Sequence, residues 1–189
     1  MKKIWFFILA LGLVFSPTLI KADYSNTIDY LQSQTQNAWI TQALASANVD
    51  NPDISYIDAQ TTDLMTAIKN VLVLTAIESD NQADLLSLSN TIDSNMSGGQ
   101  LGSADLLNDD FWGLMALKSI DQTDNISDIK EFILSQQNPD GGWGWSTTAD
   151  SDSNDTAAAV MALLDAGLTV SSVQIDAALD YIATTQNND

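Results

Sequence analysis

The stretch "NDTAAAVMALLD", residues 154–165, repeats an earlier part of the same chain. It aligns with "NDDFWGLMALKS", residues 108–119: Asn-Asp matches at the start and Met-Ala-Leu further on, both at an interval of 46 residues. The same interval before Asp109 leads to Asp63, which opens the apolar run of "TDLMTAIKNVLVLTA". Asp63, Asp109 and Asp155 therefore stand ahead of three apolar runs with helical spacing. We predict that each caps a helix by accepting a hydrogen bond from an unpaired backbone N–H.

A second element recurs at a similar interval. "FILSQQNPD", residues 132–140, resembles "YIATTQNND", residues 181–189, and a Gly-rich turn appears both as "GGQLG" from residue 98 and as "GGWGW" from residue 141. The repeating unit is thus a helix, a Gly-rich loop, a second helix and a short turn. A period of about 46–49 residues with two helices per unit is typical of a stacked helical array. The sequence predicts an all-α fold of antiparallel helical hairpins.

Apolar spacing and helix-breaking residues set the expected helix boundaries. Gly167, just after one apolar run, is expected to end a helix in the left-handed conformation that glycine adopts freely. Strand signals are weak throughout. The expected helices cover residues 25–35, 38–48, 60–78, 82–94, 109–120, 126–137, 155–166 and 172–185.

The N-terminal segment has the layout of a secretory signal peptide. A basic start, Met1–Lys3, precedes the apolar run of residues 4–15, a Ser-Pro break follows, and Ala22 offers a small residue before a cleavage point. The alternative, a membrane anchor, is disfavoured because a spanning helix needs about 20 apolar residues. We predict a signal peptide over residues 1–22 and a mature domain over residues 23–189. The protein is then secreted, or held at the cell surface or in the periplasm.

The charge balance excludes some partners. Removal of residues 1–22 leaves three lysines and no arginine against 25 acidic residues. Phosphate backbones and anionic lipids would be repelled, so neither nucleic acid nor an anionic membrane is expected as a partner. A cationic partner or divalent cations would suit the negative electrostatic potential of this surface better.

The chain has no cysteine and no histidine. Disulfides, thiolate nucleophiles and cysteine-ligated metals are therefore impossible, and the usual acid–base side chain near neutral pH is missing. Any catalysis would depend on carboxylates, hydroxyls or tyrosine.

Four residues within one segment carry a family resemblance. Phe132, Gln137, Gly141 and Trp143 have the spacing of a QW repeat, and the segment resembles squalene–hopene cyclases and the wider terpenoid cyclase/protein prenyltransferase superfamily. This one strong motif is accompanied by weaker echoes over residues 24–186. The resemblance implies an α/α toroid, in which inner helices are ringed by outer ones. In such repeats the tryptophan packs against the glutamine and a helix end, so we expect Trp143 and Trp145 to be packed.

The following "DSNDTAAAVMAL" is similar to the DxDDTA segment that holds the acid of class II cyclases. Asp152 falls on the first aspartate of that motif and Asp155 on the last, but the acid position falls on Asn154. An amide has no acidic proton to transfer, so the resemblance gives no catalytic residue here; Asp152 and Asp155 are the candidates of the alternative, enzymatic interpretation. The prenyltransferase zinc site requires cysteine and histidine and cannot be built.

The aspartates before the 155–166 run have one further interpretation. Asp150, Asp152 and Asn154 have the spacing that opens a Ca²⁺-binding loop, with Asp155 as another oxygen donor, but the glycine and the bidentate glutamate of such loops are missing. A weak Ca²⁺ site is the only cofactor hypothesis, beside the simpler one of a solvated loop. The simpler hypothesis predicts that Asp155→Ala destabilises the protein and that Asp152→Ala has little effect.

These observations favour an exported, non-catalytic binding or surface-structural module on a cyclase-like repeat scaffold. Its partner would be a small hydrophobic ligand or a cell-surface protein. The alternative is a class II terpene cyclase-like or prenyltransferase-like enzyme. The sequence ends at "TQNND", where the earlier copy continues into "GGWGW", and holds fewer hairpins than the family's ring requires, so we expect the toroid to be a partial one.

Overall fold

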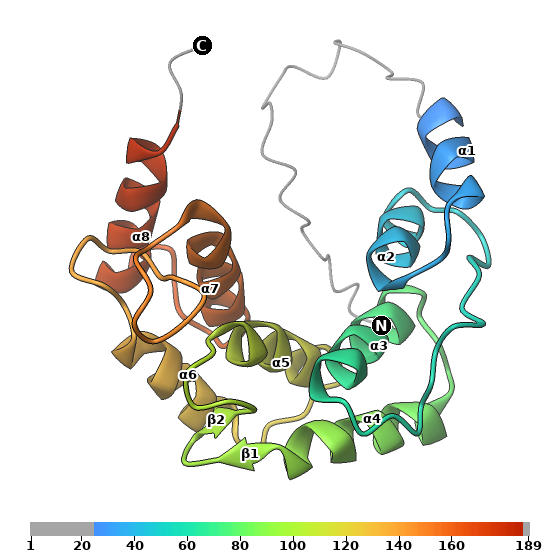
Figure 1. Cartoon of the computed structure of the whole chain (residues 1–189), viewed down its shortest axis with the longest axis horizontal. Helices are drawn as coiled ribbons and strands as arrows, with labels where there is room; N and C mark the ends of the chain where they lie inside the picture. Colours follow the sequence, from blue (N-terminus) through green and yellow to red (C-terminus); the bar gives the residue numbers. More distant parts are fainter. Residues whose placement is uncertain (1–24, 187–189) are drawn as a thin grey trace. The chain divides into compact units, whose positions relative to one another are not determined.

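The computed structural model describes residues 25–186, and the signal peptide predicted for residues 1–22 lies outside them (Figure 1). The chain divides into two compact units, residues 1–56 and 57–189. The described part of the first unit contains α1 (Ser25–Ser33) and α2 (Ala38–Ser46). Asn37 caps α2, because its side-chain oxygen accepts hydrogen bonds from the backbone N–H groups of Trp39 and Ile40.

The second unit contains the other elements, and the all-α fold predicted from the sequence is confirmed. Across residues 25–186 each expected helix is present, with boundaries shifted by at most a few residues, and a hairpin of two two-residue strands was not expected. Its elements are α3 (Leu64–Ala76), α4 (Gln82–Ser94), β1 (Met96–Ser97), β2 (Gln100–Leu101), α5 (Asn108–Ser119), α6 (Ile126–Ser135), α7 (Ser153–Asp165) and α8 (Val173–Thr184).

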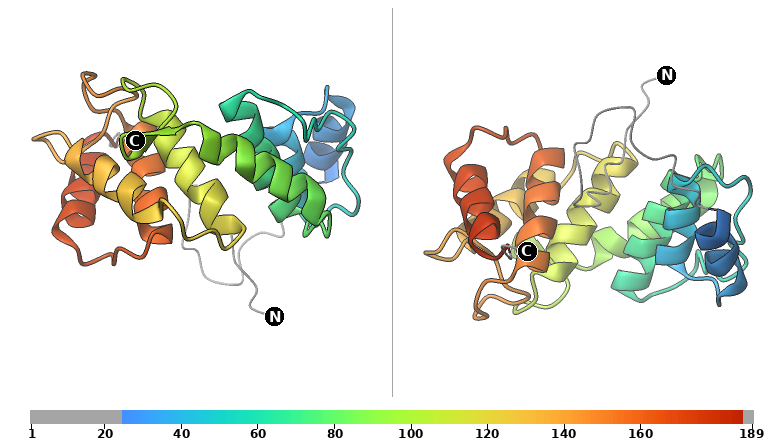
Figure 2. Two further views of the ribbon diagram at one scale, coloured as in Figure 1. Left: turned by 90° about the horizontal axis from the view of Figure 1, so that it is seen from below. Right: turned by 90° about the horizontal axis from the view of Figure 1, so that it is seen from above.

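Within this unit the helices form two rows. Helices α3, α5 and α7 lie side by side, and each packs against the helix that follows it in the chain, α4, α6 or α8 (Figures 1 and 2). Helix α5 has neighbours on several sides, and accordingly most of its length from Asp110 to Leu117 is buried. Helix α6 buries only Ile129 and Ile133, one stripe at a spacing of four residues.

Helices α3, α5 and α7, which form the first row, end in the same way. In each, the second residue after the helix cap donates its backbone N–H to a carbonyl five residues earlier: Ser79 to Leu74 at 2.8 Å, Gln122 to Leu117 and Leu168 to Leu163 at 3.0 Å. The residue before each of these donors has a positive φ. As expected, one of them is Gly167, with φ +90°; the other two are Glu78 and Asp121, with φ 52° and 57°.

The small hairpin fills the Gly-rich loop between α4 and α5. Met96 pairs with Leu101 and Ser97 with Gln100, while Gly98 and Gly99 turn the chain with positive φ. Leu101 is fully buried and α5 packs against β2. No helix among residues 25–186 is long and apolar enough to cross a membrane.

Candidate functional site at the starts of the first-row helices

Helix α7 is capped by Asp152. Its backbone is extended, and its Oδ1 accepts hydrogen bonds from the backbone N–H groups of Asn154 and Asp155, each at 2.9 Å. Asp155 lies in the first turn instead, so the prediction that it is the N-cap was wrong. The cause is the loop before the helix: Asp152 forms an antiparallel bridge with Trp143, and this pairing holds it in the extended conformation that an N-cap requires.

The other two aspartates of the repeat behave differently from one another. Asp63 is the N-cap of α3, as predicted, and accepts the backbone N–H of Thr66 at 2.8 Å. Asp109 is not a cap, because α5 starts one residue earlier and Leu107 precedes it without a side-chain cap. The Asp109 carboxylate instead turns back to accept the N–H of Ser103 at 3.3 Å.

Two buried side chains, one position further along, fasten the Gly-rich loops to these helices. Oδ1 of Asp110 accepts the backbone N–H of Leu101 at 2.8 Å. At the equivalent place in α7, Oγ1 of Thr156 accepts the N–H of Trp143 at 2.9 Å and donates to its carbonyl at 3.2 Å. Sequence reasoning missed both anchors. The signal was the alignment of "NDD" with "NDT", which places two polar side chains at one buried position.

The residues of the QW-like motif connect three elements. The Trp143 side chain is fully buried, and its indole N–H donates to the carbonyl of Ile133 in α6 at 2.8 Å. The Gln137 amide donates to the carbonyls of Gly141 and of Gln174 in α8, both at 2.8 Å. Only glycine fits at position 141, where φ is +90° and a Cβ atom would lie 2.5 Å from the carbonyl oxygen of Ala177.

The aromatic residues beside this motif are less enclosed. Phe132, in α6, is partly buried. The Trp145 side chain is 55% exposed, so the expectation that both tryptophans of "GGWGW" pack is correct only for Trp143. The backbone of Trp145 has a different contact: its carbonyl accepts the N–H of Leu107, just before α5, at 3.1 Å.

Burial is the largest influence on the carboxyl groups at these helix starts, and neighbouring carboxylates add to it. Burial, a hydrogen bond with Asp152 and the charge of Asp152 raise the pKa of Asp155 to about 7, while a hydrogen bond from Asn108 acts against them. Burial also acts on Asp152, but its hydrogen bonds from Asp155 and Asn154 lower its pKa. Burial raises the pKa of Asp110 to about 7, and burial together with the charge of Asp63 raises the pKa of Asp109.

Residues 101–189 match the family model of the prenyltransferase α-α toroid domain. This segment includes the β2 loop, the QW-like motif and helices α5 to α8. This segment is similar to prenyltransferase-type α/α-toroid domains. The resemblance to the terpenoid cyclase/protein prenyltransferase superfamily is thereby confirmed over this segment. The sequence has no significant match among curated proteins.

The chemistry open to the toroid domain at its DxDD-like segment is limited. Asn154, at the acid position, is an exposed amide. The pKa of Asp155 is raised to about 7, which makes its carboxyl a weak acid. Protonation of an alkene requires a strong acid. The Asp152 carboxylate is engaged with the backbone of α7. What the arrangement does achieve is to start a helix and to attach a loop.

Metal binding finds no preformed site here. Within residues 25–186, no three acidic side chains come together in a way that could hold a metal ion. Asp150 is exposed in the loop, Asp152 caps α7 and Asp155 lies in the helix. The structure therefore gives no support to a Ca²⁺ site at Asp150, Asp152 and Asp155, for which the sequence offered only a weak case.

Because Asp152 is the cap, we expect the stability losses at positions 152 and 155 in the opposite order to that predicted from the sequence. We expect Asp152→Ala to lower the free energy of unfolding by about 0.5–2 kcal/mol, because two backbone donors lose their acceptor. Asp155→Ala should cost less at pH 7, since it removes a carboxyl that burial and Asp152 disfavour as an anion. Asp150→Ala, at an exposed loop position, is the matched control and should stay within about 0.5 kcal/mol. Urea unfolding of the three variants measures the order, and a larger loss for Asp155→Ala would refute the assignment of the cap.

Proposed function

We propose that this protein is an exported, non-catalytic binding or surface-structural module built on a prenyltransferase-type toroid scaffold. The observation that carries the proposal is the state of the DxDD-like segment. Its acid position is the exposed amide Asn154, and the first aspartate, Asp152, is committed to capping α7. These residues lack a strong acid, and the chain lacks the cysteine and histidine of a prenyltransferase zinc site.

The helical arrangement and the charge of the chain suit a binding role. Stacked helical hairpins present an extended surface of the kind that repeat proteins use for binding. A chain with few lysines, no arginine and 25 acidic residues would repel nucleic acid and anionic lipid, and would attract cationic surfaces. The export signal proposed at residues 1–22 would place this surface outside the cytoplasm. A small hydrophobic ligand or a cell-surface protein is the partner we propose.

The alternative, a class II cyclase-like or prenyltransferase-like enzyme, is favoured only by the family of the scaffold. Incubation with squalene, and with a prenyl diphosphate plus an acceptor peptide, separates the two proposals. We expect mass spectrometry to find no cyclised or transferred product from the unaltered protein. The Asn154→Asp variant, which restores an acid at that position, should be equally inactive if the surrounding scaffold also lacks a substrate site. Product formed by the unaltered protein would refute the non-catalytic proposal.

A further inference from the structure

Asp110 is a buried carboxyl group that attaches the β1–β2 hairpin to α5. The residue is fully buried, and its Oδ1 accepts the backbone N–H of Leu101 at 2.8 Å. Its Oδ2 is also buried and has no hydrogen-bond partner among the described residues. A buried acceptor without a partner costs free energy, and an ionised one costs far more. The hairpin is therefore attached through a group whose burial is much less costly when it is protonated.

The next repeat makes the same attachment with a side chain that does not titrate. Thr156 occupies the equivalent position in α7, where its hydroxyl accepts the N–H of Trp143 at 2.9 Å and donates to the Trp143 carbonyl at 3.2 Å. Its one polar group is thus satisfied both as donor and as acceptor. Attachment of a Gly-rich loop to a first-row helix needs only a neutral hydroxyl. The carboxyl at position 110 adds a dependence on pH that the attachment itself does not require.

The hairpin depends on α5 for its closed position. It consists of two residue pairs, and a hairpin of this size is not stable by itself. Leu101 is fully buried against α5 at Gly113, where a Cβ atom would overlap the Leu101 side chain, and Ile68 of α3 adjoins the same point. Gly98, Gly99 and Gly102, all with positive φ, border the segment that holds Leu101. Movement of this segment away from α5 would expose Leu101 and admit water to Asp110.

The charges near Asp110 do not offset its burial. Burial raises the pKa of Asp110 to about 7, the charge of Asp109 adds to this effect, and the hydrogen bond from Leu101 acts against it. Strand β2 carries no titratable residue. The charged residues of the helices that pack against α5 are Lys69 on α3, Asp128, Lys130 and Glu131 on α6, and Asp155 and Asp165 on α7, with Lys118 at the end of α5 itself.

From this geometry we infer that Asp110 and the β1–β2 hairpin form a pH-sensitive switch. While Asp110 is protonated, the hairpin is closed over α5; when Asp110 ionises, the hairpin opens so that water reaches the carboxylate. The closed form has a pKa of about 7 at Asp110, whereas a carboxyl exposed by opening titrates near the ordinary value of 3.8. The open form therefore binds fewer protons between about pH 4 and pH 7, and opening becomes more favourable as the pH rises through this window. Such a switch belongs to the scaffold and is independent of whether the protein binds or catalyses.

Native-state amide hydrogen exchange of the purified protein, followed by NMR between pH 4.5 and 7.5, tests the switch. Protection factors remove the intrinsic pH dependence of exchange. We expect the protection of the Leu101 amide to fall about a hundredfold across this range, the change that a raised pKa of this size implies. Because local opening exposes little surface, low concentrations of urea should affect Leu101 exchange much less than that of the buried amide of Leu114 in α5.

Two matched substitutions separate Asp110 from the other carboxyl group whose pKa is raised to about 7. Asp110→Asn keeps an acceptor for Leu101 but does not titrate, so the protection of Leu101 should become nearly independent of pH. Asp155→Asn should leave the pH dependence at Leu101 intact, and in that variant the Trp143 amide, attached by Thr156, should keep nearly constant protection.

Three results would overturn the switch: constant protection of Leu101 in the unaltered protein, an equal fall at Trp143 in the Asp155→Asn variant, or a urea dependence at Leu101 equal to that at Leu114, which would indicate exchange through global unfolding. Should Asp110→Asn not fold, the comparison of Leu101 with Trp143 and Leu114 decides the question without it. Product analysis with squalene and prenyl diphosphates is unaffected by any of these results.

Discussion

Replacement of Trp143 by alanine is expected to lower the free energy of unfolding by about 3–5 kcal/mol, the range observed for large aromatic side chains removed from a packed core. The side chain is fully buried, and its indole N–H donates to the Ile133 carbonyl at 2.8 Å. Alanine would therefore leave a cavity where the loop before α7 meets α6. A loss of this size is a large fraction of the stability of an ordinary domain.

The chain provides a matched control for this substitution. Trp145 is two residues away in the same loop, but 55% of its side chain is exposed, so Trp145→Ala should change the free energy of unfolding by no more than about 0.5 kcal/mol. Urea unfolding followed by far-ultraviolet circular dichroism gives both values. Equal losses in the two variants would show that the loop does not enclose Trp143 as described.

The protein is also expected to lose stability as the pH rises from about 4 to about 7. Asp110 is fully buried, and burial raises its pKa from 3.8 to about 7. In this window the folded state keeps a proton that the unfolded state releases, so the free energy of unfolding falls with increasing pH. At about 1.4 kcal/mol per pKa unit, a shift of roughly three units means that Asp110 accounts for a decrease of the order of 4 kcal/mol. Asp155, whose pKa is raised to about 7, acts in the same direction.

The substitution Asp110→Asn isolates this contribution. Asparagine keeps an oxygen for the N–H of Leu101 and places an amide donor where the protonated carboxyl has its hydroxyl. We expect the variant to be close to the unaltered protein at pH 4.5 and more stable at pH 7.5, with a flatter dependence between them. Asp63 and Asp152, whose pKa values are lowered, lose their contributions only below about pH 4, outside this window.

General repulsion among the many carboxylates also grows with pH, so the experiment needs a control of equal charge. Asp124→Asn removes one negative charge at an exposed position near the end of the α5–α6 turn. Chemical unfolding at pH 4.5, 5.5, 6.5 and 7.5 should give a slope for Asp124→Asn that is close to that of the unaltered protein. If both variants flatten the curve equally, the pH dependence comes from overall charge and not from Asp110.

The sequence alone determined the helical repeat, because the information is local. Apolar residues at helical spacing, followed by turn residues, predicted α4 over residues 82–94 without error and α5 to within one residue. The QW-like spacing likewise predicted that Trp143 packs and that Gln137 takes part in a structural motif. The repeat interval correctly predicted Asp63 as a cap, and α3 begins at the next residue, Leu64.

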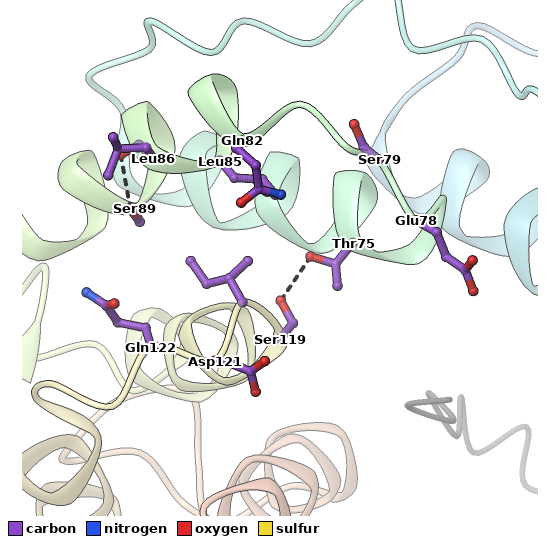
Figure 3. A pocket seen from close by; sticks show the side chains of 11 residues that line it. Thr75, Glu78, Ser79, Gln82, Leu85, Leu86, Ser89, Ser119, Asp121 and Gln122 are labelled. Atoms are coloured by element: carbon purple, nitrogen blue, oxygen red, sulfur yellow. Dashed lines mark hydrogen bonds between the residues drawn. The ribbon is translucent and has the colours of Figure 1, made fainter. Parts of the chain in front are cut away.

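Tertiary contacts decided the rest, since they join residues that the sequence pattern does not relate. The repeat interval made Asp155 the equivalent of the cap residue Asp63. The bridge between Trp143 and Asp152 instead places the start of α7 earlier in the chain, so that Asp152 is the N-cap. Trp143 and Trp145 lie two residues apart in the same Gly-rich loop, yet Trp143 is buried against α6 whereas 55% of the Trp145 side chain is exposed. The raised pKa of Asp110 exists only because β2 folds back onto α5 and removes water from the carboxyl. The hydrogen bond between the Thr75 and Ser119 hydroxyls likewise joins the ends of α3 and α5 (Figure 3), which are far apart in the chain and which no local propensity brings together.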